Sequence, residues 1–247
     1  MIRTRRSRAR APLIWIHGWL GDGGGDRTLR GLGRDVVSLT LPGYAAGGAS
    51  GEMGVEAAVK AVGEAAKQQP DAVLVGHSMG GLIAVRSGLE SHLRPRGLVL
   101  LAPVPPSGVY LEARARDLFA GATGDAVLLG KVVDYLTAKR LPSRWVESVV
   151  KDARRRASPE VLAAYLEGWV RPTPECGFMQ PWDVPALLLL GRYDRAITSE
   201  LATREILPWT PRARCVLLDE CGHFPLAEVP LRTLRLIDDF LGSLDET

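Results

Sequence analysis

Residues 73–82 read VLVGHSMGGL, an apolar run of β-forming residues that ends at a serine between glycines. Ser78 therefore stands where a buried strand ends and a helix begins. A turn this sharp strains the backbone of the serine, and only residues without bulk fit two positions before and two positions after it. Gly76 and Gly80 occupy these two positions. The pattern predicts a nucleophile elbow, a turn that raises the Ser78 hydroxyl above the edge of a sheet.

Apolar runs on both sides of this motif alternate with helical patterns. We expect buried strands over residues 13–17, 36–41, 72–75, 97–101, 185–190 and 214–218. We expect helices over residues 54–69 and 79–89, near 199–207, and at the C-terminus through Leu234, Ile237 and Leu241. Such alternation is typical of a parallel sheet with right-handed crossovers. The predicted fold class is therefore α/β, with a doubly wound, mostly parallel sheet of about six strands.

The alternation stops between about Pro103 and Trp182, where four helical stretches follow one another and no strand is expected. We predict an α/β core of residues 12–103 and 183–247, an all-helical cap inserted at 104–182, and a basic disordered tail at 1–11. The aromatic residues of this insertion are Tyr110, Phe119, Trp145, Tyr165, Trp169, Phe178 and Trp182. Most of them are expected to pack against one another, and a minority to face the elbow as an apolar substrate pocket.

Two later segments, PALLLLGRYD at 185–194 and RCVLLDECGH at 214–223, each end a strand with a chemically useful residue. With the elbow, they make the chain resemble the α/β-hydrolase family over nearly all of residues 13–241. The resemblance implies the order nucleophile, acid, base: Ser78, Asp194 and His223. A serine hydroxyl needs such a base to remove its proton. The alternatives are a small residue tolerated at a tight turn, a turn or capping aspartate, and a structural histidine.

The resemblance also implies where the substrate carbonyl is held. The backbone N–H of Met79, directly after the nucleophile, is expected to bind the oxyanion. The family's HG-x motif supplies a second N–H, here that of Trp19, and the side chains of Trp19 and His77 are expected to contact substrate. His17 is expected to hold this loop by hydrogen bonding. The glycines at 21–25 indicate a flexible loop, because no Gly-Lys-Ser/Thr sequence follows for phosphate binding.

Composition limits the partners. The 247 residues carry a formal charge of +3, but residues 1–10 hold five arginines and no acid, so the rest carries −2. The body of the chain therefore gives no reason to expect nucleic acid binding. No apolar run reaches the length of a membrane span. Three cysteines without disulfide or zinc spacing favour a cytoplasmic protein, and no metal or other cofactor is implied.

These observations predict a serine hydrolase that cleaves a carboxylic ester of a small, largely apolar substrate. The main alternative is a thioesterase or acyl-transferring cyclase. The basic run KDARRR at 151–156, with Lys139, Arg140 and Arg144, is either a solvated helix face or a docking surface for coenzyme A or an acyl carrier. Ester and thioester cleavage use the same residues, so the motifs do not separate them. A perhydrolase and a hydrolase-like receptor without catalytic activity are further alternatives.

Overall fold

The computed structural model describes residues 10–21, 23–44, 51–171 and 180–246. A six-stranded sheet forms its centre, with the spatial order β2-β1-β3-β4-β7-β8, and every neighbouring pair is parallel. The strands are β1 (Leu13–Ile16), β2 (Val36–Leu39), β3 (Val73–His77), β4 (Gly97–Leu101), β7 (Ala186–Gly191) and β8 (Ala213–Leu218). The predicted fold class is confirmed. Its six main strands lie at the predicted places, with ends that differ by at most two residues.

Helices cover both faces of this sheet, because alternate residues of each inner strand point to opposite sides. In β1, Ile14 and Ile16 belong to one hydrophobic cluster, and Leu13 and Trp15 belong to the other. The first face is covered by α2 (Val55–Lys67), α3 (Met79–Glu90) and α8 (Ser199–Glu205). The second is covered by α1 (Gly25–Arg30), α9 (Pro225–Glu228) and α10 (Pro230–Asp245). The carboxyl ends of the strands are thereby left open for a site.

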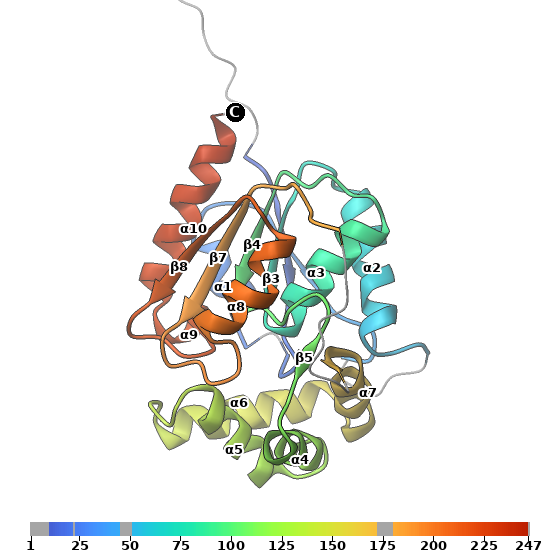
Figure 1. Ribbon diagram of the computed structural model, residues 1–247, viewed down its shortest axis with the longest axis vertical. Coiled ribbons are helices and arrows are strands. Elements are labelled where there is room, and N and C mark those ends of the chain that lie inside the picture. The colour runs from blue at the N-terminus through green and yellow to red at the C-terminus, as the bar shows by residue number, and fades with distance from the viewer. Residues whose placement is uncertain (1–9, 22, 45–50, 172–179, 247) are drawn as a thin grey trace, which may run out of the picture.

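Among the described residues between β4 and β7, four further helices follow one another along the chain. They are α4 (Ala113–Ala122), α5 (Ala126–Leu136), α6 (Ser143–Arg156) and α7 (Pro159–Trp169). Figure 1 shows them gathered at the lower end of the molecule, and the arrow of β7 points toward them. Ser158 caps α7 by accepting a hydrogen bond from the backbone N–H of Val161. The division of the chain into core and insertion at residues 104–182 stays a prediction.

The expectation of no strand between residues 103 and 182 is wrong. Two short strands, β5 (Val109–Tyr110) and β6 (Val170–Arg171), pair in parallel at the two ends of the helical series. Two residues are too few to show a strand's alternation in sequence, and the partners are about sixty residues apart. The pairing therefore depends on the tertiary fold and leaves no local signal.

The loop expected at residues 21–25 also differs in part, because α1 begins at Gly25. A Cβ at Gly25 would lie 2.4 Å from the Trp15 ring, so this helix packs directly on the sheet. The predicted tail up to residue 9, Cys176 and Phe178 lie outside the described residues. Trp182 packs against Gly88 of α3 and not within the insertion.

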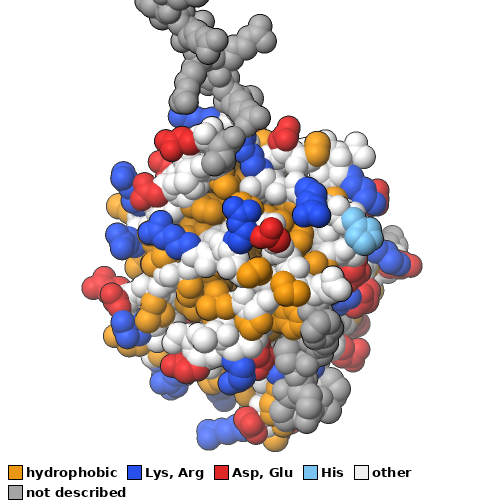
Figure 2. Space-filling model, turned by 45° about the horizontal axis from the view of Figure 1, so that its top comes forward, with side chains coloured by type: hydrophobic (Ala, Val, Ile, Leu, Met, Phe, Trp, Pro, Cys, Tyr) orange, Lys and Arg blue, Asp and Glu red, His pale blue; other side chains and the backbone are white. Residues whose placement is uncertain are grey.

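Charged side chains of both signs are interspersed on the face that Figure 2 shows, in which the top of the view in Figure 1 is turned toward the reader. Between them, hydrophobic side chains reach the surface in small groups. Across the described residues, no helix has the length and apolar character needed to cross a bilayer.

Candidate active site

The turn at Ser78 has the strained geometry expected of an elbow. Its backbone angles are φ 53° and ψ −121°, a region that residues with a side chain seldom occupy. A Cβ at Gly76 would lie 2.5 Å from the Gly80 carbonyl oxygen, and one at Gly80 would lie 2.2 Å from that of Ile16. The Ser78 N–H donates to the Leu101 carbonyl of β4 at 2.9 Å. The hydrogen bond to β4 thus holds the backbone in this turn, and glycine at positions 76 and 80 leaves the space that the turn requires.

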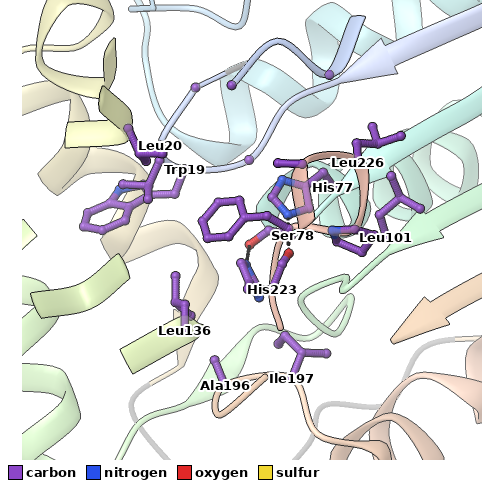
Figure 3. A pocket seen from close by; sticks show the side chains of 18 of the residues that line it. Trp19, Leu20, His77, Ser78, Leu101, Leu136, Ala196, Ile197, His223 and Leu226 are labelled. Carbon is purple, nitrogen blue, oxygen red and sulfur yellow. Dashed lines mark hydrogen bonds between the residues drawn. The ribbon is translucent and has the colours of Figure 1, made fainter. Parts of the chain in front are cut away.

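The three predicted side chains converge although they come from distant parts of the chain. Ser78 follows β3, Asp194 follows β7 and His223 follows β8. His223 Nε2 lies 2.8 Å from Ser78 Oγ, and His223 Nδ1 lies 2.6 Å from Asp194 Oδ2. All three are buried, and Ser78 is the most exposed of them at 9%. Figure 3 shows the Ser78 and His223 side chains directed toward one another in a cavity.

Asp194 is held in place by backbone N–H groups as well as by His223. Its second oxygen, Oδ1, accepts hydrogen bonds from the backbone N–H groups of Ala196 and Ile197, at 2.9 and 3.0 Å. Both oxygens of this buried carboxylate therefore have hydrogen-bond donors, as a buried polar group requires. Burial and, next to it, the Asp194 charge raise the pKa of Tyr135, whose hydroxyl donates to the Arg195 carbonyl. Tyr135 therefore stays protonated and ties α5 to this turn.

The two predicted oxyanion donors lie in the chain beside Ser78. Met79 is the first residue of α3, and Gly18 lies against Ser78, since a Cβ there would be 3.2 Å from that of the serine. Trp19 follows Gly18 and is held at both ends: its indole donates to the Leu162 carbonyl, and its own carbonyl accepts from Tyr44. Within the described part of the chain, neither the Met79 nor the Trp19 backbone N–H has a hydrogen-bond acceptor. Their role at an oxyanion stays a prediction.

His77 and His17 are neutral in the fold. Burial, reinforced by the nearby His223, lowers the pKa of His77 to about 3. Burial also lowers the pKa of His17 to about 4, with Arg156 contributing in the same direction. His77 Nε2 donates to the backbone carbonyl of His223 at 2.8 Å, so its main polar contact is within the protein. The ring also borders the cavity, and the predicted substrate contact of His77 stays a prediction.

The cavity in front of Ser78 has a volume of about 200 Å³ and mainly apolar walls. Three aromatic side chains meet at one wall: Phe119 lies with its ring centre 5.7 Å from that of Trp19 and 5.5 Å from that of Trp169. Trp145 packs edge-on against Phe224 at another wall. As Figure 3 shows, most of the labelled side chains around the serine are hydrophobic, and the exceptions are His77 and His223. A site of this size and polarity suits a small apolar group.

Several lining residues escaped the sequence analysis. One face of α6 lines the cavity with Trp145, which the sequence analysis named, and with Ser148, Val149 and Asp152, which it did not. Their spacing of three, one and three residues is a helical stripe, and that stripe was the available signal. Of the aromatic residues singled out in the insertion, Phe119, Trp145 and Trp169 line the cavity. The Tyr165 hydroxyl of α7 donates to the Pro42 carbonyl, which ties α7 to the segment after β2.

The fold and this arrangement of serine, histidine and aspartate define a hydrolase. The chain matches the model of the alpha/beta hydrolase family over residues 13–236 and belongs to that family. This confirms the family that the sequence resembled. Within the described residues, no three His, Cys, Asp or Glu side chains are grouped so as to hold a metal ion.

Curated relatives and solved structures agree with this assignment. The chain is 27% identical over 246 residues to a pimeloyl-[acyl-carrier protein] methyl ester esterase from Nitrosomonas europaea, covering 92% of this chain and 94% of the relative. It is 30% identical over 215 residues to the protein of the same name from Klebsiella pneumoniae subsp. pneumoniae, covering 78% and 77%. An esterase from Exiguobacterium antarcticum superposes with a TM-score of 0.78 at 17% identity, over 97% of this chain and 93% of that chain.

Proposed function

We propose that the protein is a serine hydrolase that cleaves a carboxylic ester of a small, largely apolar substrate through an acyl-enzyme on Ser78. The observation that carries this proposal is the continuous chain of hydrogen bonds from Ser78 through His223 to Asp194. The Asp194 carboxylate accepts, so His223 Nδ1 carries the proton and Nε2 is left as the base. This tautomer is the one that can remove the proton from the Ser78 hydroxyl.

The reaction then runs in two halves. As Ser78 Oγ attacks the ester carbonyl, His223 takes its proton, and the Met79 and Trp19 N–H groups bind the oxygen on which negative charge develops. His223 next gives the proton to the leaving alcohol, and the acyl group stays on Ser78. Water, deprotonated by His223, attacks the acyl-enzyme, and His223 returns this proton to Ser78 Oγ as the acid is released. Asp194 stabilises the imidazolium that forms in each half.

The ester is favoured over the thioester by the relatives, since the curated proteins and the solved structure reported above are named as esterases. The aromatic wall of Trp19, Phe119 and Trp169 favours an apolar acyl group. The expected cytoplasmic location is part of the proposal. It rests on the cysteines, of which the described Cys215 and Cys221 are unpaired.

A more specific candidate substrate is an ester bound to an acyl carrier protein, and helix α6 provides the observation that favours it. One face of α6 lines the cavity, while the remaining faces carry the cations Arg144, Lys151, Arg154 and Arg155. Arg155 forms an ion pair with Asp152, but Arg144 and Lys151 have no ion pair within the described residues. These cations, on a helix that borders the cavity, would attract an acidic acyl carrier domain to it. The curated relatives are named for esters on such a carrier.

The carrier candidate is tested by comparing one methyl ester presented on an acyl carrier protein and in free form. In the double variant Arg144→Glu/Lys151→Glu, KM should rise about tenfold or more for the carrier-bound ester only, and wild-type KM should rise with salt. The charge reversal Lys60→Glu in α2 is the matched control. Equal effects on the free and carrier-bound esters would exclude docking through α6.

The hydrolase itself is tested with Ser78→Ala and p-nitrophenyl esters of two to eight acyl carbons. The variant should lose activity by at least about 10³-fold, and a fluorophosphonate should label wild-type Ser78 at neutral pH. A variant with full activity would exclude the mechanism. If wild type forms no adduct and cleaves no ester, the hydrolase-like receptor becomes the better interpretation.

A further inference from the structure

One buried carboxylate holds the chain segment that carries His223. Glu228 Oε2 accepts the backbone N–H of Gly222 at 2.8 Å, and its Oε1 accepts that of Phe224 at 3.0 Å. These two amides flank His223, so the hydrogen bonds of a single side chain hold the backbone on both sides of the histidine. The Glu228 side chain is only 1% exposed. Together with the His77 bond to the His223 carbonyl, it leaves this backbone little freedom to shift.

The charge of Glu228 is balanced from the helical insertion. Arg140, in the turn between α5 and α6, donates through Nη1 to Glu228 Oε2 at 3.0 Å and through Nη2 to the Glu220 carbonyl at 2.9 Å. Its guanidinium also lies over the Tyr193 ring, 4.3 Å from the ring centre. Tyr193 immediately precedes Asp194. One arginine of the insertion therefore touches both the segment that ends in the acid and the segment that bears the base.

Close packing reinforces this junction. A Cβ at Gly222 would lie 3.0 Å from Thr137 Cα and 3.1 Å from the Leu136 carbonyl oxygen, so the end of α5 rests on the histidine segment. Glu228 is absent from the described lining of the cavity, which extends along this segment only to Ala227. Glu228 can therefore affect the position of His223 without touching bound substrate.

We propose that Glu228 is a positioning residue for the reaction assigned to Ser78, and that Arg140 makes the position of His223 depend on the helical insertion. The proposal rests on the proposed function. Proton transfer from Ser78 needs His223 Nε2 at its distance of 2.8 Å, and a misplacement of about 1 Å costs about 100-fold in rate. Loss of the Glu228 contacts should lower kcat and leave KM nearly unchanged.

The test compares four variants in ester hydrolysis, with active sites counted by fluorophosphonate titration. Glu228→Gln keeps the side-chain volume, but its NH₂ group cannot accept from one of the two amides; kcat should fall about 10- to 100-fold, with KM within about twofold. Arg140→Met should lower kcat about three- to tenfold because the carboxylate loses its cation, and Arg140→Lys should recover part of that loss. Arg192→Met, which removes an exposed ion pair with Asp219, is the matched control and should retain full kcat.

The outcomes separate this inference from the proposed function. If Glu228→Gln lowers Tm but keeps kcat per titrated site within about twofold of wild type, Glu228 is structural only and the inference is wrong. If Glu228→Gln does not fold, an unchanged kcat in Arg140→Met overturns the inference, and a lowered kcat that Arg140→Lys partly restores supports it. Failure of wild type to hydrolyse any ester would instead overturn the proposed function.

Discussion

Asp194 and His223 are joined by a hydrogen bond of 2.6 Å between Oδ2 and Nδ1, while the other oxygen of Asp194 binds two backbone N–H groups of its own turn. The aspartate thus orients the imidazole and also folds the turn that carries Ala196 and Ile197. Both of these residues line the cavity. Substitutions of Asp194 should therefore separate two effects, one on the tautomer of His223 and one on the stability of the turn.

Asp194→Asn should lose activity while keeping most of its stability. Its amide oxygen still accepts from the turn, but its NH₂ group faces His223 Nδ1 and favours the tautomer that carries a proton on Nε2, so the base is lost. We expect kcat to fall about 10³–10⁴-fold. Asp194→Ala should be equally inactive and also less stable by about 1–3 kcal/mol, because buried N–H groups lose their acceptor. Urea denaturation and steady-state assays measure both effects. Equal stability of the two variants would contradict the second role of Asp194.

The neutral histidines predict a loss of stability in mild acid. Burial lowers the pKa of His77 to about 3 and that of His17 to about 4, whereas unfolded histidine titrates near 6.5. The unfolded chain therefore binds more protons as the pH falls below about 6.5, and the free energy of unfolding decreases from there toward the folded-state pKa values. Each histidine contributes a slope of up to about 1.4 kcal/mol per pH unit.

This slope is measured by urea denaturation at pH 7, 6 and 5. Because His77→Gln removes one titrating group and keeps a donor for the His223 carbonyl, its free energy of unfolding should fall less steeply than that of wild type. The carboxylates titrate in both proteins, so their contribution to the pH dependence of unfolding cancels when the two curves are compared. Parallel pH curves for the two proteins would show that His77 does not remain neutral in the fold.

Replacing an elbow glycine by alanine should strongly destabilise the fold, because the new side chain has no space. In Gly80→Ala, the new Cβ would meet the Ile16 carbonyl oxygen at 2.2 Å, and neither backbone can move freely. We expect a loss of at least about 3 kcal/mol in the free energy of unfolding, together with loss of activity. The control is Gly242→Ala in α10, where nothing lies within 4 Å of the new atom and a gain of about 0.5–1 kcal/mol is expected. A stable Gly80→Ala protein would argue against the close approach of α3 and β1.

Phe119 should limit the length of the acyl group. It is buried between Trp19 and Trp169 at the wall of the cavity, so Phe119→Ala opens space there and should move the preferred p-nitrophenyl ester to longer acyl chains. The same substitution should cost about 3–5 kcal/mol in stability. Phe240→Ala, in the cluster on the other face of the sheet, should cost stability without changing the chain-length profile. An unchanged profile in Phe119→Ala would place the acyl group elsewhere.

Much of the architecture could be predicted because its signals are local. The six strands of the sheet are short apolar runs, Ser78 lies between glycines that a sharp turn requires, and Asp194 and His223 each follow a strand. Parallel strands bring their carboxyl ends to one edge, so these three residues could be expected to meet before any distance was known. The family order of the three residues supplied the remaining constraint.

The remaining features depend on contacts that no local pattern reveals. Arg140 and Glu228 are 88 positions apart, and in sequence each is one more charged residue near a helix end. The β5–β6 pair also leaves no signal in the sequence, because each strand has only two residues. His77 was expected to contact substrate, which stays a prediction, but its bond to the His223 carbonyl was not foreseen, because it is set by how β3 and the segment after β8 pack. Such pairings are decided by the tertiary fold.

The pairing of Val109 with Val170 and of Tyr110 with Arg171 brings the entry and exit of the helical series to adjacent rungs of one small ladder. The chain between these paired residues leaves the fold and returns to it at adjacent positions. Lengthening or shortening this segment therefore need not displace β4 or β7. A new specificity could therefore be introduced beside the same Ser78, His223 and Asp194 by exchanging one contiguous stretch of sequence in which Arg140 and its contacts are kept.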